Sequence, residues 1–71
     1  MIYELIDLET GNVLGAYESE ESALRFVRDF AIRNRPELLT SIALIQDDDT
    51  GRGTILSEGA ALLYRAASLA A

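Results

Sequence analysis

The sequence predicts an α+β domain in which two β-hairpins form one antiparallel sheet and two helices pack on one face of it, in the order ββαββα. Two observations lead to this prediction. Segments rich in β-branched and aromatic residues occur as two pairs, each pair separated by a turn that contains glycine. Each pair is then followed by a segment with helix-forming composition. At 71 residues the chain forms a single domain, residues 1–71, whose last few residues are expected to fray.

The first hairpin is expected over residues 2–18, with strands at 2–8 and 13–18. Gly11 lies between them and can adopt positive φ without a Cβ clash. A type I turn that closes through a bulge is therefore expected at this position.

The clearest helix signal begins at Ser19, whose hydroxyl can accept a hydrogen bond from the first free amides of a helix. The two glutamates that follow it place negative charge at the positive end of the helix dipole. Pro36 disfavours helical geometry in the residue before it, so the helix is expected over about residues 19–34. Ile32 is the one apolar residue in the middle of the polar face. The inward face contains Ala23, Phe26, Val27, Phe30 and Ala31.

The second hairpin is expected to pair residues 41–46 with 54–57 across the polar loop 47–53. An alanine-rich helix follows at about residues 58–68, with Ser57 as its cap. The two halves of the chain also resemble each other in the order of their motifs. This similarity is expected either from an internal duplication or from the general likeness of any two hairpins that lead into capped helices.

Composition excludes several classes of function. The formal charge is −6, with twelve acidic residues and six basic ones that are all arginine, which argues against nucleic acid or an anionic membrane as partner. The absence of histidine, lysine and cysteine removes imidazole and thiolate metal ligands, His-based triads and Schiff-base chemistry. We therefore expect no catalytic, cofactor or metal site. Without a leader or a long apolar run, a cytoplasmic location is expected.

The loop Asp47–Asp49 is the strongest candidate for cation binding, but it does not fit a calcium loop. If Asp47 is the first ligand, the position that requires glycine is occupied by Arg52. If Asp48 is first, Gly59 stands where the bidentate glutamate belongs. Two interpretations remain: weak, non-specific cation binding, or a solvated hairpin turn whose charge protects a sheet edge.

Several elements are apolar on both faces, which is unusual in so small a chain. The hydrophobic fraction is 49%, and no disulfide or thiolate metal site is available to compensate for a small core. One sheet layer under two helices leaves part of this surface uncovered, so we expect an interface with a second copy or another protein. The sequence places its candidate interface residues at Ile32, Leu62 and Leu69.

The run from Tyr3 to Asn12, the second strand and the Ser-Glu-Glu-Ser-Ala-Leu start of the helix resemble small acidic bacterial proteins of unassigned function. This resemblance implies a ββαββα fold and no particular activity. The hairpin followed by Glu-Glu-x-Ala-Leu is also distantly similar to HicB-like antitoxins, although their additional strand and DNA-binding appendage are not visible here. The sequence thus predicts a non-catalytic interaction module that forms a homodimer. The alternative is an antitoxin-like inhibitor whose acidic surface binds a basic protein.

Overall fold

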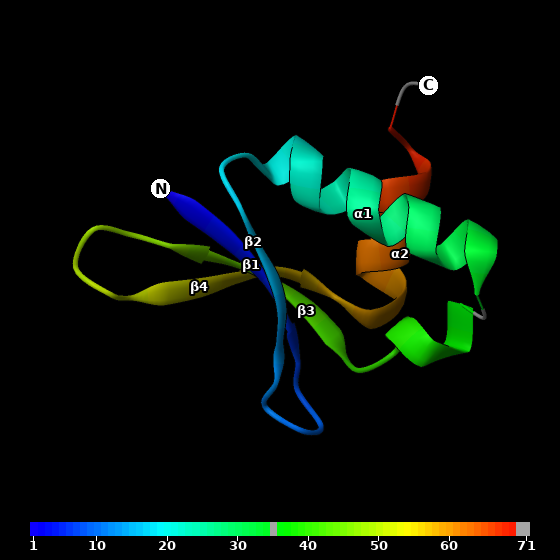
Figure 1. Ribbon diagram of the computed structural model, residues 1–71, viewed down its shortest axis with the longest axis horizontal. Helices are drawn as coiled ribbons and strands as arrows, with labels where there is room; N and C mark the ends of the chain where they lie inside the picture. Colours follow the sequence, from blue (N-terminus) through cyan, green and yellow to red (C-terminus); the bar gives the residue numbers. More distant parts are fainter. Residues whose placement is uncertain (35, 70–71) are drawn as a thin grey trace.

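The computed structural model describes residues 1–34 and 36–69, with Pro36 and Leu38 described for their backbone alone. The predicted fold class is confirmed, because four strands and two α-helices follow one another in the order ββαββα (Figure 1). A short 3-10 helix, which the sequence did not predict, precedes the second hairpin. The elements are β1 (Ile2–Asp7), β2 (Val13–Tyr17), α1 (Glu20–Arg33), the 3-10 helix (Pro36–Leu39), β3 (Ile42–Asp47), β4 (Gly53–Glu58) and α2 (Gly59–Ala67).

The four strands form one antiparallel sheet in the order β2-β1-β3-β4, so the first strand of each hairpin lies in the centre. Leu5 on β1 pairs directly with Leu44 on β3. Each hairpin has a bulge at the corresponding place, between Leu5 and Ile6 in one and between Leu44 and Ile45 in the other. The sheet is therefore nearly two-fold symmetric about the Leu5–Leu44 pair, which agrees with the similarity between the two halves of the sequence.

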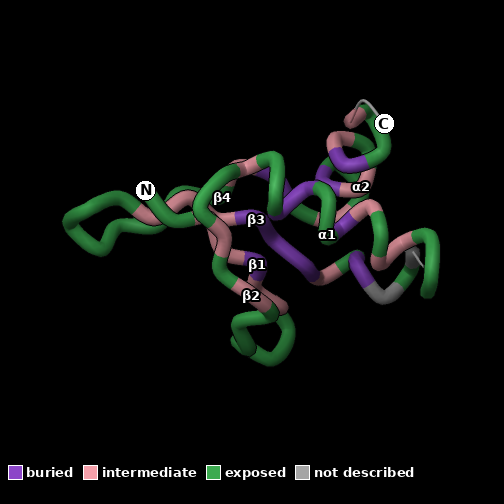
Figure 2. Tube along the Cα trace, turned by 45° about the horizontal axis from the view of Figure 1, so that its top comes forward, coloured by how far each residue is buried: buried purple, intermediate pink, exposed green. Residues whose placement is uncertain are grey.

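Both helices pack on the same face of the sheet. Figure 1 shows them together on one side, while the two hairpin turns project away from them. Helix α1 contacts β1 and β2, helix α2 contacts β3 and β4, and the two helices also contact each other. Figure 2 shows the buried residues where the central strands meet the helices. This core contains Leu5, Ala23, Leu24, Val27, Leu39, Ile42, Leu44, Leu62 and Ala66.

The first hairpin turn follows the prediction. Gly11 has a φ of +77° and its amide donates to the Asp7 carbonyl at 2.7 Å, while the Asp7 amide donates to the Asn12 carbonyl at 2.8 Å. The Asp7 carboxylate accepts from the Glu9 amide at 2.9 Å, which lowers the pKa of Asp7 below its ordinary value. Leu8 lies in the turn rather than in the predicted strand, although its amide still donates to Ser41 across the sheet at 2.8 Å.

One of the two predicted helix caps is confirmed and the other is wrong. The Ser19 hydroxyl accepts from the Ser22 amide at 3.1 Å, as expected of an N-cap. Ser57 instead lies inside β4, and Glu58 occupies the cap position of α2 without a side-chain hydrogen bond. The chain turns from strand to helix at Gly59, with a φ of +56°, and a Cβ there would lie 3.1 Å from the Thr40 carbonyl oxygen. This turn requires glycine, because other residues strongly disfavour such a backbone.

Arg65 connects three elements. Its guanidinium forms an ion pair with Glu20 at the start of α1 and donates to the Ser57 hydroxyl of β4 at 3.5 Å. Glu20 therefore both complements the α1 dipole and holds α2 in place. Since both charged side chains are partly exposed, we expect this pair to orient the helices more than to stabilise the fold.

We predict that Leu62→Ala lowers the free energy of unfolding by about 2–5 kcal/mol, because Leu62 is fully buried and its removal leaves a cavity. The matched change Leu8→Ala, at a leucine that is half exposed, should cost less than about 1 kcal/mol. Urea unfolding followed by circular dichroism measures both. If Leu62→Ala does not fold, Leu62→Val serves in its place with an expected loss of about 1 kcal/mol. Equal losses at the two positions would contradict the assigned core.

Candidate interaction surfaces

A shallow apolar hollow lies between the two helices on their outer side. Its volume is about 330 Å³, and three of the six described residues that line it are alanines, from both helices. Ile32, one of the lining residues, has 77% of its surface exposed, and Tyr64 on α2 is equally exposed at 76%. The described lining residues are Arg28, Ala31, Ile32, Leu63, Ala66 and Ala67.

The three candidate interface residues from the sequence lie in three different environments. Ile32 is exposed, whereas Leu69 is partly buried against the core. The prediction that Leu62 is at the surface is wrong, because Leu62 is a fully buried residue of the core. Helix α2 is apolar on both sides, so the sequence could not establish which side packs on the sheet. The sequence did not single out Tyr64, whose side chain on the same helix is 76% exposed.

The face of the sheet opposite the helices is also apolar, and no described element covers it. Side chains alternate along a strand, so residues next to the buried Leu5 and Leu44 project to this other side. We call this surface the open sheet face. Its large apolar residues are Ile2, Ile6, Leu8, Val13, Ile45 and Ile55, of which Ile2, Leu8, Val13 and Ile55 are 47–54% exposed.

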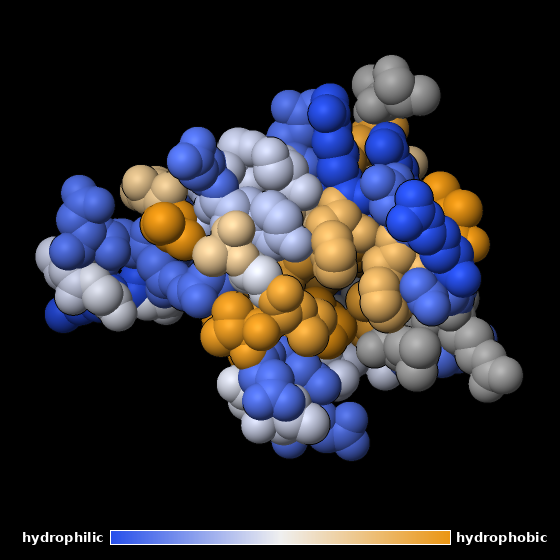
Figure 3. All heavy atoms as spheres, viewed as in Figure 1, coloured by the Kyte–Doolittle hydropathy of each residue, from blue (hydrophilic) through white to orange (hydrophobic). Residues whose placement is uncertain are grey.

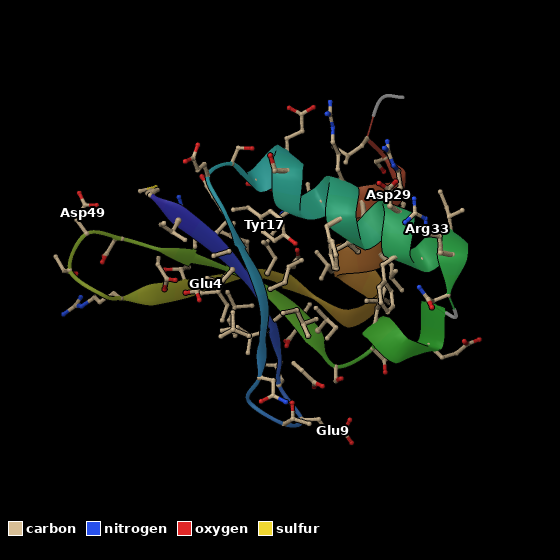
Figure 4. All side chains as sticks on the ribbon, viewed as in Figure 1. Glu4, Glu9, Tyr17, Asp29, Arg33 and Asp49 are labelled. Atoms are coloured by element: carbon tan, nitrogen blue, oxygen red, sulfur yellow. The ribbon has the colours of Figure 1, made fainter. Side chains whose placement is uncertain are left out.

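Two carboxyl groups interrupt the open sheet face. Glu4 pairs with Ile45 across the central strands and Asp47 pairs with Ile2, so the two acids are diagonal neighbours on one face. A hydrogen bond with Asp47, partial burial and the Asp47 charge raise the pKa of Glu4 above its ordinary value of 4.5. Figure 4 marks Glu4 beside the central strands, and neither acid forms an ion pair with any other residue in the described part of the chain.

A row of aromatic residues follows the side of α1 that faces β2. The rings of Tyr17 and Phe26 lie 6.0 Å apart, and those of Phe26 and Phe30 lie 6.1 Å apart. Figure 4 shows Tyr17 beneath α1, where burial raises the pKa of its hydroxyl. Apolar atoms reach the surface between the β1–β2 turn and α1 in Figure 3. A second hollow of about 200 Å³ lies at the end of this row, lined by Phe26, Asp29, Phe30, Arg33 and Asn34.

The Asp47–Asp49 loop is held by hydrogen bonds to its own Asp48 carboxylate. The Asp48 carboxylate accepts from the Thr50 hydroxyl at 2.7 Å, from the Thr50 amide at 2.8 Å and from the Arg52 amide at 2.9 Å. These bonds lower the pKa of Asp48, with the Thr50 side chain as the largest cause. Asp48 thus stabilises the turn, as Asp7 does in the first hairpin. Among the described residues, no group of three His, Cys, Asp or Glu side chains is placed to hold a metal ion.

Both edges of the sheet carry a bulge, one in β2 at Leu14 and one in β4 at Leu56. A bulge interrupts the regular row of backbone donors and acceptors that an added strand needs. A partner is therefore better placed to contact side chains on the helices or on the open sheet face than to extend the sheet.

Comparison of the chain with protein-family models, with curated proteins and with solved structures finds no match. None of the helices within residues 1–34 and 36–69 is long and apolar enough to cross a membrane.

We predict that Glu4→Gln raises the free energy of unfolding at pH 7 by up to about 1 kcal/mol. The pKa of Glu4 is raised in the folded state, so folding is penalised when this carboxyl ionises. The penalty exists above the raised pKa and disappears as the pH falls below the ordinary value of 4.5, so the two proteins should be equally stable near pH 3. Urea unfolding at both pH values measures this. Glu9→Gln, in the exposed turn, is the control, and a gain that persists in acid would contradict the account.

Proposed function

We propose that this chain is a non-catalytic protein-interaction module that self-associates through the outer side of its two helices. The observation that supports the proposal most is the position of Ile32. A β-branched apolar side chain that is 77% exposed lines part of an apolar hollow of about 330 Å³. Folding alone gives no reason for an isoleucine at this position.

The projecting side chain and the hollow belong to the same surface, which suits a two-fold dimer. In such an interface each contact occurs twice, so Ile32 of one copy can enter the hollow of its partner while the reverse contact forms. Complete burial of an isoleucine side chain contributes about 1.5–3 kcal/mol. Tyr64, on the neighbouring helix, adds an exposed aromatic side chain of the kind that interfaces favour.

The distribution of charge favours the helices over other surfaces for contact between identical acidic chains. Helix α1 contains three acidic and three basic residues and α2 contains one arginine, so together the helices carry a net charge of +1. The rest of the chain, with nine acidic residues and two arginines, carries −7. Two copies therefore repel each other least when the helices face one another.

The hollow is poorly suited to catalysis, which supports a binding role. Among the described residues that line it, Arg28 is the one with a charge, and its guanidinium lies 3.5 Å from the Asp29 carboxylate. The remaining lining residues are apolar, so they supply neither an acid nor a base.

We predict that the protein sediments at twice its chain mass of 7.8 kDa at high concentration, and that Ile32→Glu weakens this association at least tenfold. Analytical ultracentrifugation from about 1 μM to 1 mM measures the dissociation constant. Ile55→Glu is the matched control, because it makes the same change at an exposed isoleucine on the open sheet face. A monomeric mass across the whole range, or equal weakening by both variants, would contradict the proposal.

A further inference from the structure

The open sheet face remains unused if the chain self-associates through its helices. Six large apolar residues lie on it, and four of them are about half exposed. Five of the six belong to strands of the sheet that supports the core, and Leu8 directly follows β1. An antiparallel sheet often has one face in contact with solvent, but the side chains on that face are normally polar. Here Ile2 and Ile6 flank Glu4 on the central strand β1, and Ile45 lies directly opposite it. Exposed apolar surface of this kind marks a site of protein interaction.

The strands carry a single sign of charge. Together they contain four acidic residues, Glu4, Asp7, Asp47 and Glu58, and no basic residue. Glu4, Asp47 and Glu58 are on the open sheet face, because each pairs with or neighbours residues of that face. No described basic side chain forms an ion pair with any of the three. The face therefore combines apolar surface with negative charge that has no partner within the described chain.

A second copy of this chain would fit the open sheet face poorly. Face-to-face packing of two identical sheets would bring the carboxylates of Glu4, Asp47 and Glu58 close to the same groups of the partner, with no cation between them. Like charges that lose water at an interface cost several kcal/mol. A cationic side chain would instead neutralise both members of the Glu4 and Asp47 pair. The bulges at both edges also disfavour an added strand, which leaves side-chain packing onto the face.

We propose that the open sheet face docks an amphipathic helix of another protein, one whose apolar side carries a lysine or arginine that pairs with Glu4 and Asp47. This helix would form a third layer and cover Ile2, Ile45 and Ile55. The raised pKa of Glu4 is consistent with this arrangement, because its largest cause is a hydrogen bond with Asp47, which requires the two carboxyl groups to lie close enough for one cation to contact both. The site lies on the opposite side of the sheet from the proposed self-association surface and is independent of it.

The test uses two synthetic helical peptides of sixteen residues with leucine on one face, identical except for arginine or glutamate at the centre of that face. Their binding to the full chain is measured by calorimetry, and the contacts are located by NMR shifts. We expect the arginine peptide to bind at least tenfold more tightly and to shift Ile2, Ile45 and Ile55. In the variant Glu4→Gln/Asp47→Asn this preference should fall at least fivefold.

The control Glu9→Gln/Asp49→Asn makes the same change in net charge at the two exposed turns and should keep the full preference. The proposal is overturned if neither peptide binds, if both double variants lose the preference equally, or if the shifts occur on α1 and α2. It is also overturned if resonances of the open sheet face broaden with protein concentration alone, since a second copy would then cover this face. Repeating the titration with Ile32→Glu separates this result from the state of the proposed dimer.

Discussion

The packing of both helices against one face of the sheet is the constraint on which the rest of the structure depends. Leu5 and Leu44 pair at the centre of the sheet and are fully buried beneath Val27 and Leu62, one from each helix. A chain of this length has enough helix to cover one face and not two, because small domains bury a limited share of their surface. The core is therefore complete on one side, while the other side of the same strands stays apolar and exposed.

The charged residues are also distributed unequally between the helix side and the strand side of the molecule. The helices are nearly neutral and the strands are acidic, so the two sides of the molecule present different chemistry to a partner. Apolar contacts beside Ile32 require no charge compensation, which suits an identical copy. The open sheet face surrounds uncompensated carboxylates with isoleucine, which suits a cationic partner. A module that joins copies on one side and binds another protein on the other is consistent with both features.

Sequence reasoning succeeded where local physics determines the outcome. Gly11 adopts the positive φ that its turn requires, and Ser19 caps α1 through its own hydroxyl, because both depend on neighbouring residues.

Sequence reasoning failed where tertiary packing determines the structure. Either side of α2 could have entered the core, and only contact with the sheet selects Leu62 over Tyr64. The cap at Ser57 failed for a similar reason, since pairing with Leu44 extends β4 through Ser57 and moves the start of the helix to Gly59. Ile32 was found because an isoleucine within a charged helix face breaks a local pattern.

The central claim, that the helices form the contact between copies, is tested most directly by intermolecular NOEs in an equal mixture of isotope-labelled and unlabelled protein at about 1 mM. The account predicts NOEs from the Ile32 methyl groups of one copy to Leu63 and Ala67 of the other. Methyl groups of the open sheet face, such as those of Val13 and Ile55, should give none. Intermolecular NOEs that involve Val13 and Ile55 but not Ile32, or none anywhere at this concentration, would contradict the account.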